Sequence, residues 1–252
     1  MNSYVITAIA FGAMFGGAAF GALLRDRLPS HHLQAESRDM VQLGAGFIAT
    51  LAALVLGLMV TSAKDAFDAV NGGVTEGAGS CVNLDRILAQ YGLETNVARD
   101  QLRLSVVAEI ERTWPAGPVD PNRGRMATSP ELETLASTLR QLSPRDDSQR
   151  ILKDVALDVF SHIMTLRWQV QLRANPAIPA TFLVMLIFWF AVMFALFTLL
   201  SPRNLTVTVV LLLCALSGAG GIMIIQDMSR PFQGVVRVSS APLDDALRQL
   251  GR

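Results

Sequence analysis

Four long apolar stretches constrain this chain more than any other feature of its sequence. None contains Asp, Glu, Lys or Arg, and they comprise Tyr4–Leu24, Leu43–Ala63, Ile178–Leu200 and Leu205–Ile225. At about 1.5 Å per residue, helices of this length cross a hydrocarbon core of about 30 Å. Because only helices and closed barrels satisfy their own backbone in lipid, the sequence predicts four transmembrane helices.

The position of the first stretch resembles that of a secretory signal, but its leader, Met1–Ser3, carries no basic side chain. Its apolar run also exceeds the roughly 7–15 residues of a signal peptide, so we expect a retained membrane helix. The chain then divides into a first transmembrane hairpin (1–63), a helical insert (64–174), a second hairpin (175–226) and a C-terminal tail (227–252).

Four crossings place both termini and the insert on one side of the membrane. Of the 21 Lys and Arg residues, 13 lie between Lys64 and Arg173. Basic loops tend to remain in the cytoplasm, so the insert, the tail and both termini are expected there.

The second apolar stretch continues into a longer helical pattern. From Gly46 to Tyr91, apolar or small residues recur at alternating steps of three and four, which is typical of a coiled-coil-like seam. This pattern predicts one helix from about Val41 to Tyr91, with Gly92 as its terminator. The seam packs either on the chain's own helices or on another subunit, and beyond the membrane it includes Phe67, Val70, Val74, Leu84 and Leu88.

The neighbouring face of the same helix becomes polar where it leaves the membrane. Its residues recur at steps of three or four and comprise Thr50, Leu54, Gly57, Thr61, Asp65 and Asp68. In lipid, Thr and Gly serve close helix packing. The alternative is that this stripe lines a water-filled axis in a ring of subunits.

The insert contains three further helix signals. The first is Asn96, as the cap of a helix ending near Trp114; the others are Ser129-Pro130 and Ser143-Pro144, the latter opening a helix to about Arg173. We therefore predict an all-α fold: four transmembrane helices and an extramembrane bundle built from extensions of helices 2 and 3.

The sequence also predicts how several glycines and aromatic residues pack. Gly12, Gly16, Gly17 and Gly21 in the first stretch suit tight helix packing. Close backbone approach is also the favoured explanation for Gly72, Gly73, Gly77 and Gly79. The Phe-rich third stretch suits an outer, lipid-facing position.

The tail carries a motif comprising Arg230, Pro231, Phe232 and Gly234. Arg230 and Phe232 could bind a ligand or a neighbouring subunit. The favoured interpretation is a turn, because Pro231 fixes φ and Gly234 permits unusual angles. Asp227 is close enough in sequence to pair with Arg230, and Ser240 can cap a short final helix.

No residue pattern predicts a reaction. Cys81 and Cys214 are expected to be buried small apolar residues, His162 a surface or packing residue, and the adjacent His31 and His32 lack partners at metal-ligand spacing. Neither a phosphate-binding glycine loop nor a nucleophile elbow is found. The formal charge of zero does not suggest nucleic acid. We expect no enzyme, cofactor or metal.

Several motifs resemble the bacterial bestrophin-like domain family. They are Leu56-Gly-Leu-Met-Val60, Ser62-Ala-Lys-Asp-Ala-Phe67, Leu84-Asp-Arg-Ile-Leu-Ala-Gln-Tyr-Gly92, Ala98-Arg99, Asp227-Met-Ser-Arg-Pro-Phe-Gln-Gly234 and Val238-Ser-Ser-Ala-Pro-Leu243. The resemblance spans about Gly44 to Leu250, and the tail is its most specific part.

The likeness of this family to bestrophins, which are pentameric anion channels with cytosolic termini, implies a homo-oligomer in the bacterial inner membrane. The leading hypothesis is an ion channel whose second helix lines the axis and passes an inorganic ion. The alternative is a membrane-anchored helical scaffold or signalling partner. The stripe from Thr50 to Thr61 lacks a bestrophin-type aromatic neck, and the chain lacks an acidic calcium clasp; anion selectivity and calcium gating therefore do not follow from the likeness.

Overall fold

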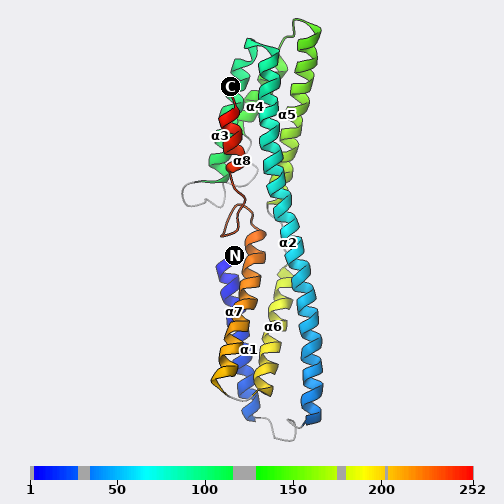
Figure 1. The fold of residues 1–252 in the computed structure, drawn as a ribbon, viewed down its shortest axis with the longest axis vertical. Coiled ribbons are helices and arrows are strands. Elements are labelled where there is room, and N and C mark those ends of the chain that lie inside the picture. Colours follow the sequence, from blue (N-terminus) through cyan, green and yellow to red (C-terminus); the bar gives the residue numbers. More distant parts are fainter. Residues whose placement is uncertain (1–2, 28–34, 116–128, 175–179, 202–203, 252) are drawn as a thin grey trace. The chain divides into compact units, whose positions relative to one another are not determined.

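A computed structural model describes residues 3–27, 35–115, 129–174, 180–201 and 204–251, and these form helices without a strand (Figure 1). The helices are α1 (Ser3–Arg27), α2 (Ala35–Tyr91), α3 (Asn96–Thr113), α4 (Pro130–Gln141), α5 (Asp147–Arg173), α6 (Ala180–Leu200), α7 (Leu205–Met228) and α8 (Ala241–Gln249), with a 3₁₀ turn η2 (Leu93–Thr95). The predicted all-α fold is confirmed.

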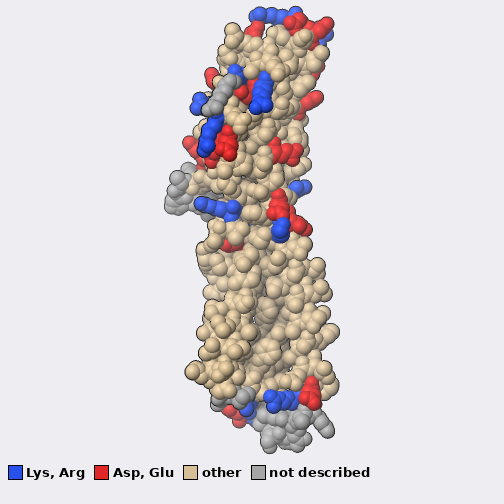
Figure 2. Space-filling model, in the orientation of Figure 1, with Lys and Arg blue, Asp and Glu red and all other residues tan. Residues whose placement is uncertain are grey.

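The chain forms two compact units. Unit 1 comprises residues 1–66 and 176–236, and unit 2 comprises residues 67–175 and 237–252. Helix α2 contributes residues to both units. The four predicted membrane helices correspond to α1, α2, α6 and α7, each long and apolar enough to cross a membrane. Figure 2 shows a broad surface without charged side chains over most of unit 1, and such helices imply a lipid bilayer.

In unit 1, α1 and α6 approach each other closely through small residues. A Cβ atom added to Gly17 or Gly21 would overlap the backbone carbonyl of Ala191 or Ala195, respectively. Gly12 and Gly16 face no atom within 4 Å. The predicted tight packing is therefore confirmed at two of the four glycines, both on the α6 side of α1.

The apolar core of unit 1 corrects two predictions. Phe194 of α6 is only 6% exposed and belongs to this core with Met14 and Leu186, so the aromatic residues of α6 are not all on the outside. Cys214 of α7 is exposed, whereas Cys81 of α2 is buried as predicted. A helix that is apolar on every side gives no sequence signal for the face that packs.

Two arginines at one end of unit 1 bind the C-terminal carbonyls of α6. The Arg25 guanidinium of α1 donates to the Ser201 carbonyl, and the Arg38 guanidinium of α2 donates to the Leu200 carbonyl at 3.0 Å. The last carbonyls of a helix lack intrahelical partners and carry partial negative charge, so cations stabilise this end.

Unit 2 is a helical bundle with a core of large aliphatic and aromatic side chains. Its centre includes Leu84 and Leu88 of α2, Leu102 of α3, Leu135 and Leu139 of α4 and Phe160 of α5. Figure 1 shows α3 and α5 on either side of α2 within this unit. Helix α8 also belongs to unit 2, because Leu243, Leu247 and Leu250 pack against the same core.

The helix ends in unit 2 confirm some predicted signals and correct others. Helix α2 ends at Tyr91, and Gly92 has the positive φ of 136° that suits a glycine terminator. The predicted Asn96 cap is wrong: Asn96 is the first residue of α3, and Thr95 precedes it. The predicted Ser143 start is also wrong, because Asp146 caps α5 by accepting from the Gln149 amide. A carboxylate three residues later competes successfully with Ser-Pro for this role.

The buried face of α2 differs from the predicted seam within unit 1. Ala45, Ala52 and Met59 are buried there although the seam does not include them, whereas the seam members Gly46, Ala53 and Val60 are exposed. Ala63, at the end of unit 1, is a seam member and is buried. A heptad repeat drifts by about 20° per heptad relative to a straight helix of 3.6 residues per turn. A seam that matches the core in unit 2 therefore drifts away from the buried face towards the start of α2 in unit 1.

The glycine cluster of α2 lies in an unbroken helix. A Cβ added to Gly73 would come within 2.6 Å of Val170 of α5, which fits close approach at this one position. A Cβ added to Gly72, Gly77 or Gly79 would meet no atom of another part of the chain within 4 Å. The predicted close approach is thus wrong for three of the four glycines within this chain.

Candidate functional site

The predicted polar stripe lies on an uncovered face of α2. Thr50, Leu54, Gly57, Thr61 and Asp65 are all exposed in unit 1, and Leu54 is 60% exposed. They lie on the side of the helix opposite the buried residues Ala52 and Ala63, by helical spacing. Asp68, three residues beyond Asp65, belongs to unit 2 and is also exposed.

The two threonines of the stripe satisfy their hydroxyl donors within α2. Thr50 Oγ1 donates to the Gly46 carbonyl at 2.9 Å, and Thr61 Oγ1 donates to the Gly57 carbonyl at 3.1 Å. Each oxygen retains lone pairs that can accept from water or an ion's hydration shell. A Cβ at Gly57 would meet no atom within 4 Å. The face is therefore small, weakly polar and open.

The seam residues beyond the membrane lie against unit 2's own helices. Val70, Val74, Leu84 and Leu88 are buried, and Phe67 is partly buried. Leu84 and Leu88 are part of the bundle core. The stripe and the seam are thus separated on α2, with the stripe exposed and the seam covered.

The tail motif is organised around a buried carboxylate. Asp227, at the end of α7, is 4% exposed, and its Oδ2 accepts from the Val235 amide at 2.9 Å. The Arg230 amide donates to the Asp227 carbonyl at 2.9 Å. Gly234 has φ of 94°, and a Cβ there would lie 2.7 Å from the Asp227 carboxylate. Only glycine fits this turn, which matches the structural interpretation of the motif.

The other tail residues lie in the same turn. Pro231 is buried, while Arg230 and Phe232 are partly buried and both make contacts in the structure. In α8, Ser240 precedes the first helical residue, and its hydroxyl bonds the Asp244 carboxylate at 2.8 Å. The predicted short helix is present, but Ser240 does not cap it through a side-chain bond to the backbone.

A buried ion pair that the sequence analysis did not single out joins α2, α3 and the C-terminus. The Arg99 Nε and Nη2 atoms donate to the two Asp85 oxygens at 2.7 and 2.9 Å, and the Gly251 amide donates to Asp85 Oδ2 at 3.2 Å. Asp85 is 3% exposed. The hydrogen bond from Asp85 raises the pKa of Arg99 above its usual range, against the lowering effect of burial. The sequence feature that could have pointed to this pair is the position of both residues inside the family motifs.

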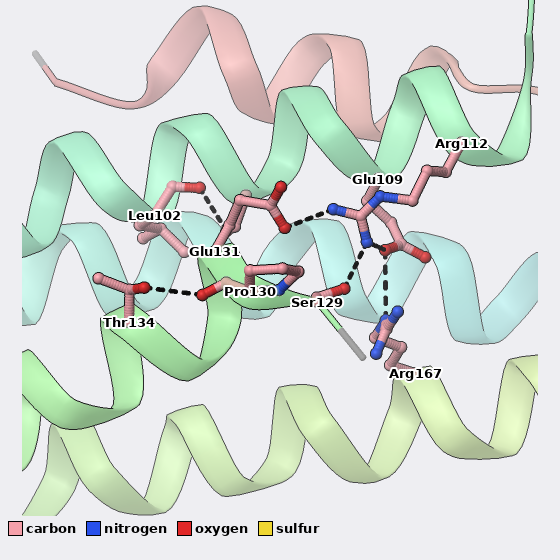
Figure 3. Close-up of polar contacts among 9 residues, drawn as sticks. Leu102, Glu109, Arg112, Ser129, Pro130, Glu131, Thr134 and Arg167 are labelled. Carbon is pink, nitrogen blue, oxygen red and sulfur yellow. Dashed lines mark hydrogen bonds and ion pairs between the residues drawn. The ribbon is translucent and has the colours of Figure 1, made fainter. Parts of the chain in front are cut away.

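A second polar network joins α3, α4 and α5 (Figure 3). Arg112 donates to the Ser129 hydroxyl and to Glu131 Oε2, each at 2.5 Å, while Arg167 donates to Glu109 Oε2 at 3.2 Å. Glu109 lies 3.7 Å from Arg112 and so links the two arginines. The pKa of Glu131 is lowered, first by a backbone hydrogen bond and then by Arg112, against the raising effect of burial.

The histidines form no metal cluster in the described part of the chain. His162 is exposed, with Nε2 2.9 Å from Glu76 Oε1, while His31 and His32 lie outside the described residues. Over those same ranges, no group of three His, Cys, Asp or Glu side chains is arranged to hold a metal ion.

Comparison with known proteins adds one finding. The chain matches the sequence profile of the Bestrophin-like domain over residues 12–243, which covers α1 from Gly12 onward, the other three apolar helices and the tail motif. Searches of curated proteins and of solved structures gave no match.

Proposed function

Because this chain belongs to the Bestrophin-like domain family, we propose that it is a homo-oligomeric ion channel whose α2 helices surround a central axis. One observation carries the proposal. The stripe from Thr50 to Asp65 places Thr, Gly and Asp within and beside an apolar span of α2, and the chain's own described helices do not cover it. A ring of subunits would turn that face inward.

The same proposal includes the cellular setting. The protein lies in a bacterial inner membrane with both termini and unit 2 in the cytoplasm, as a pentamer by analogy with bestrophins. It passes an inorganic ion, and it is neither an enzyme nor dependent on a cofactor. Asp65, just beyond the apolar span, is the charged stripe residue nearest the membrane, and Asp68 lies one turn farther towards the cytoplasm.

Recording from purified protein in planar bilayers tests this function. We expect discrete conductance steps, and we expect Thr61→Lys and Asp65→Lys to shift the reversal potential in a salt gradient towards anion preference. Asp154→Lys on α5, away from the stripe, is the matched control and should leave the reversal potential unchanged. Absence of conductance, or selectivity indifferent to both stripe substitutions, would contradict the proposal.

One observation favours a non-conducting scaffold as a second candidate. Unit 2 exposes large apolar side chains on α3, where Val97 and Leu104 are 61% and 62% exposed, and on α5, where Ile151 is 64% exposed. Exposed apolar side chains that adjoin one another mark sites of protein interaction. The scaffold predicts cytosolic partners that crosslink to these residues, together with an axis sealed by apolar side chains.

A further inference from the structure

A groove of about 410 Å³ opens between α4 and α5 in unit 2. Its volume lies within the range of small-molecule sites, roughly 300–1,000 Å³. Apolar side chains from both helices line it: Leu132 and Ala136 from α4, and Phe160 and Met164 from α5. Trp168 of α5 also lines the groove and is 48% exposed, which is unusual for so large an apolar surface.

The polar groups of the groove are mostly hydrogen-bond donors. Arg140, Arg167, Gln171 and the Ser129 hydroxyl line it, against a single carboxylate, Glu133. The side chains that line the groove therefore carry two positive charges and one negative charge. A donor-rich, net cationic lining favours an anion.

The two arginines differ in how much of their charge is already matched. The Arg167 side chain is 15% exposed and its Nε donates to Glu109, so its charge is largely offset. Arg140 is exposed; its backbone carbonyl accepts from Lys153 Nζ at 2.8 Å, but no described residue pairs with its guanidinium. Arg140 is the group that remains available for an anionic ligand.

We propose that this groove binds a small anionic molecule with an apolar body, such as an aromatic carboxylate. The apolar body lies over Ala136, Phe160 and Met164, beside the Trp168 ring. The anionic group binds the Arg140 guanidinium. Glu133, on the same wall, disfavours a second negative charge on the ligand, so monoanions are preferred to dianions.

Titration of 2-naphthoate into the full-length protein tests the site. The protein is held in nanodiscs of zwitterionic lipid, and binding is followed by saturation-transfer NMR. We expect saturable binding of 2-naphthoate and at least about tenfold weaker binding of the neutral 2-naphthamide, because a charge-assisted hydrogen bond is worth about 1.5–3 kcal/mol. Arg140→Gln should weaken naphthoate binding by a similar factor. Arg150→Gln, on an exposed α5 arginine that does not line the groove, should leave it unchanged.

A groove-filling variant provides an independent readout. Ala136→Leu places three extra carbons over the apolar floor and should abolish naphthoate binding without a change in helical circular dichroism. Equal affinity for the acid and the amide, or unchanged binding in Arg140→Gln, would overturn the proposal. Repeating the titration in phosphatidylglycerol nanodiscs identifies the source of the natural anion. Weaker naphthoate binding in these nanodiscs indicates that the lipid headgroup occupies the groove, and unchanged naphthoate binding indicates that the natural ligand is a soluble molecule. These binding measurements do not depend on ion conduction, so a failure of the channel proposal in bilayer recordings would not affect them.

Discussion

The two units of this protein are stabilised by different means, although α2 contributes to both. In unit 1, α1 and α6 approach so closely at Gly17 and Gly21 that no side chain fits between their backbones. In unit 2, large side chains such as Leu88, Leu102 and Leu135 fill the core, and a buried ion pair crosses it. In lipid, burying apolar area brings little gain, so dispersion at close range dominates; in water, removing large apolar surfaces stabilises the bundle.

The largest expected effect comes from breaking the buried ion pair of unit 2. Asp85→Ala removes the carboxylate that accepts two hydrogen bonds from Arg99 and one from the Gly251 amide. We expect a loss of about 3–5 kcal/mol in the free energy of unfolding, measured by denaturant titration of the purified full-length protein. The matched control is Asp245→Ala in the exposed pair with Arg248, which should cost less than about 1 kcal/mol. Equal losses in both variants would contradict this account.

The corresponding test in unit 1 is Gly21→Ala. The added methyl group overlaps the Ala195 carbonyl and must push α1 away from α6, at a cost of about 1–3 kcal/mol. Gly16→Ala lies on the same helix with no atom within 4 Å and is the control. Thermal unfolding in detergent should show a lowered midpoint for the first variant alone. An equal decrease in the unfolding midpoint of Gly16→Ala would mean that the effect comes from replacing any glycine of α1, and not from the close approach of α1 to α6.

A smaller effect is expected at the junction of α2 and α3. The buried Thr95 hydroxyl lies 2.5 Å from the Leu88 carbonyl and 2.7 Å from the Gly92 carbonyl. Thr95→Val keeps the shape but removes the donor, so we expect a loss of about 1–2 kcal/mol. Hydrogen exchange should accelerate at the end of α2. Thr134→Val, whose exposed hydroxyl bonds only its own helix at Pro130, should show little change.

The smallest effect concerns the pH dependence of α4. Because the folded pKa of Glu131 is lowered, its contribution to stability is fully present above its ordinary pKa of 4.5 and is lost as the pH falls through the lowered value. The protection of α4 amides against hydrogen exchange, relative to their intrinsic exchange rate at each pH, should therefore decrease below about pH 4.5 in the native chain. In Glu131→Gln, the change in α4 amide protection with acid should be absent. If the change persists in this variant, another carboxylate causes it.

Hydropathy and helix length were sufficient to predict the all-α fold and four apolar helices. The helix signals were reliable where one residue must adopt a special backbone angle, as at Gly92, and unreliable where several polar residues compete, as at Ser143 and Asp146. The predicted seam coincides with the buried face of α2 in unit 2, where only one face of the helix is apolar. In unit 1 the helix is apolar on most sides, so the sequence does not distinguish Ala52 from Ala53.

Candidate sites were predicted unevenly for a related reason. The stripe from Thr50 to Asp65 could be found because polar residues are rare in an apolar span. Arg112 and Arg167 could not, because surface-type charged residues are common in soluble helices and only the tertiary structure pairs them. Asp85 and Arg99 lie in family motifs, but their pairing too depends on the tertiary structure. The groove beside Arg140 depends on how α4 packs on α5, which no local pattern reports.

The most direct test of the central claim is the access of water to the exposed face of α2. We would measure ionic current through Thr61→Cys protein, with Cys214→Ala as background, before and after adding a charged, membrane-impermeant thiol reagent. If α2 lines the path of the ion, the reagent changes the current through Thr61→Cys protein and leaves the current through Leu216→Cys protein, altered on the exposed surface of α7, unchanged. A reagent that alters neither variant, in protein that conducts, would show that α2 does not line the path of the ion.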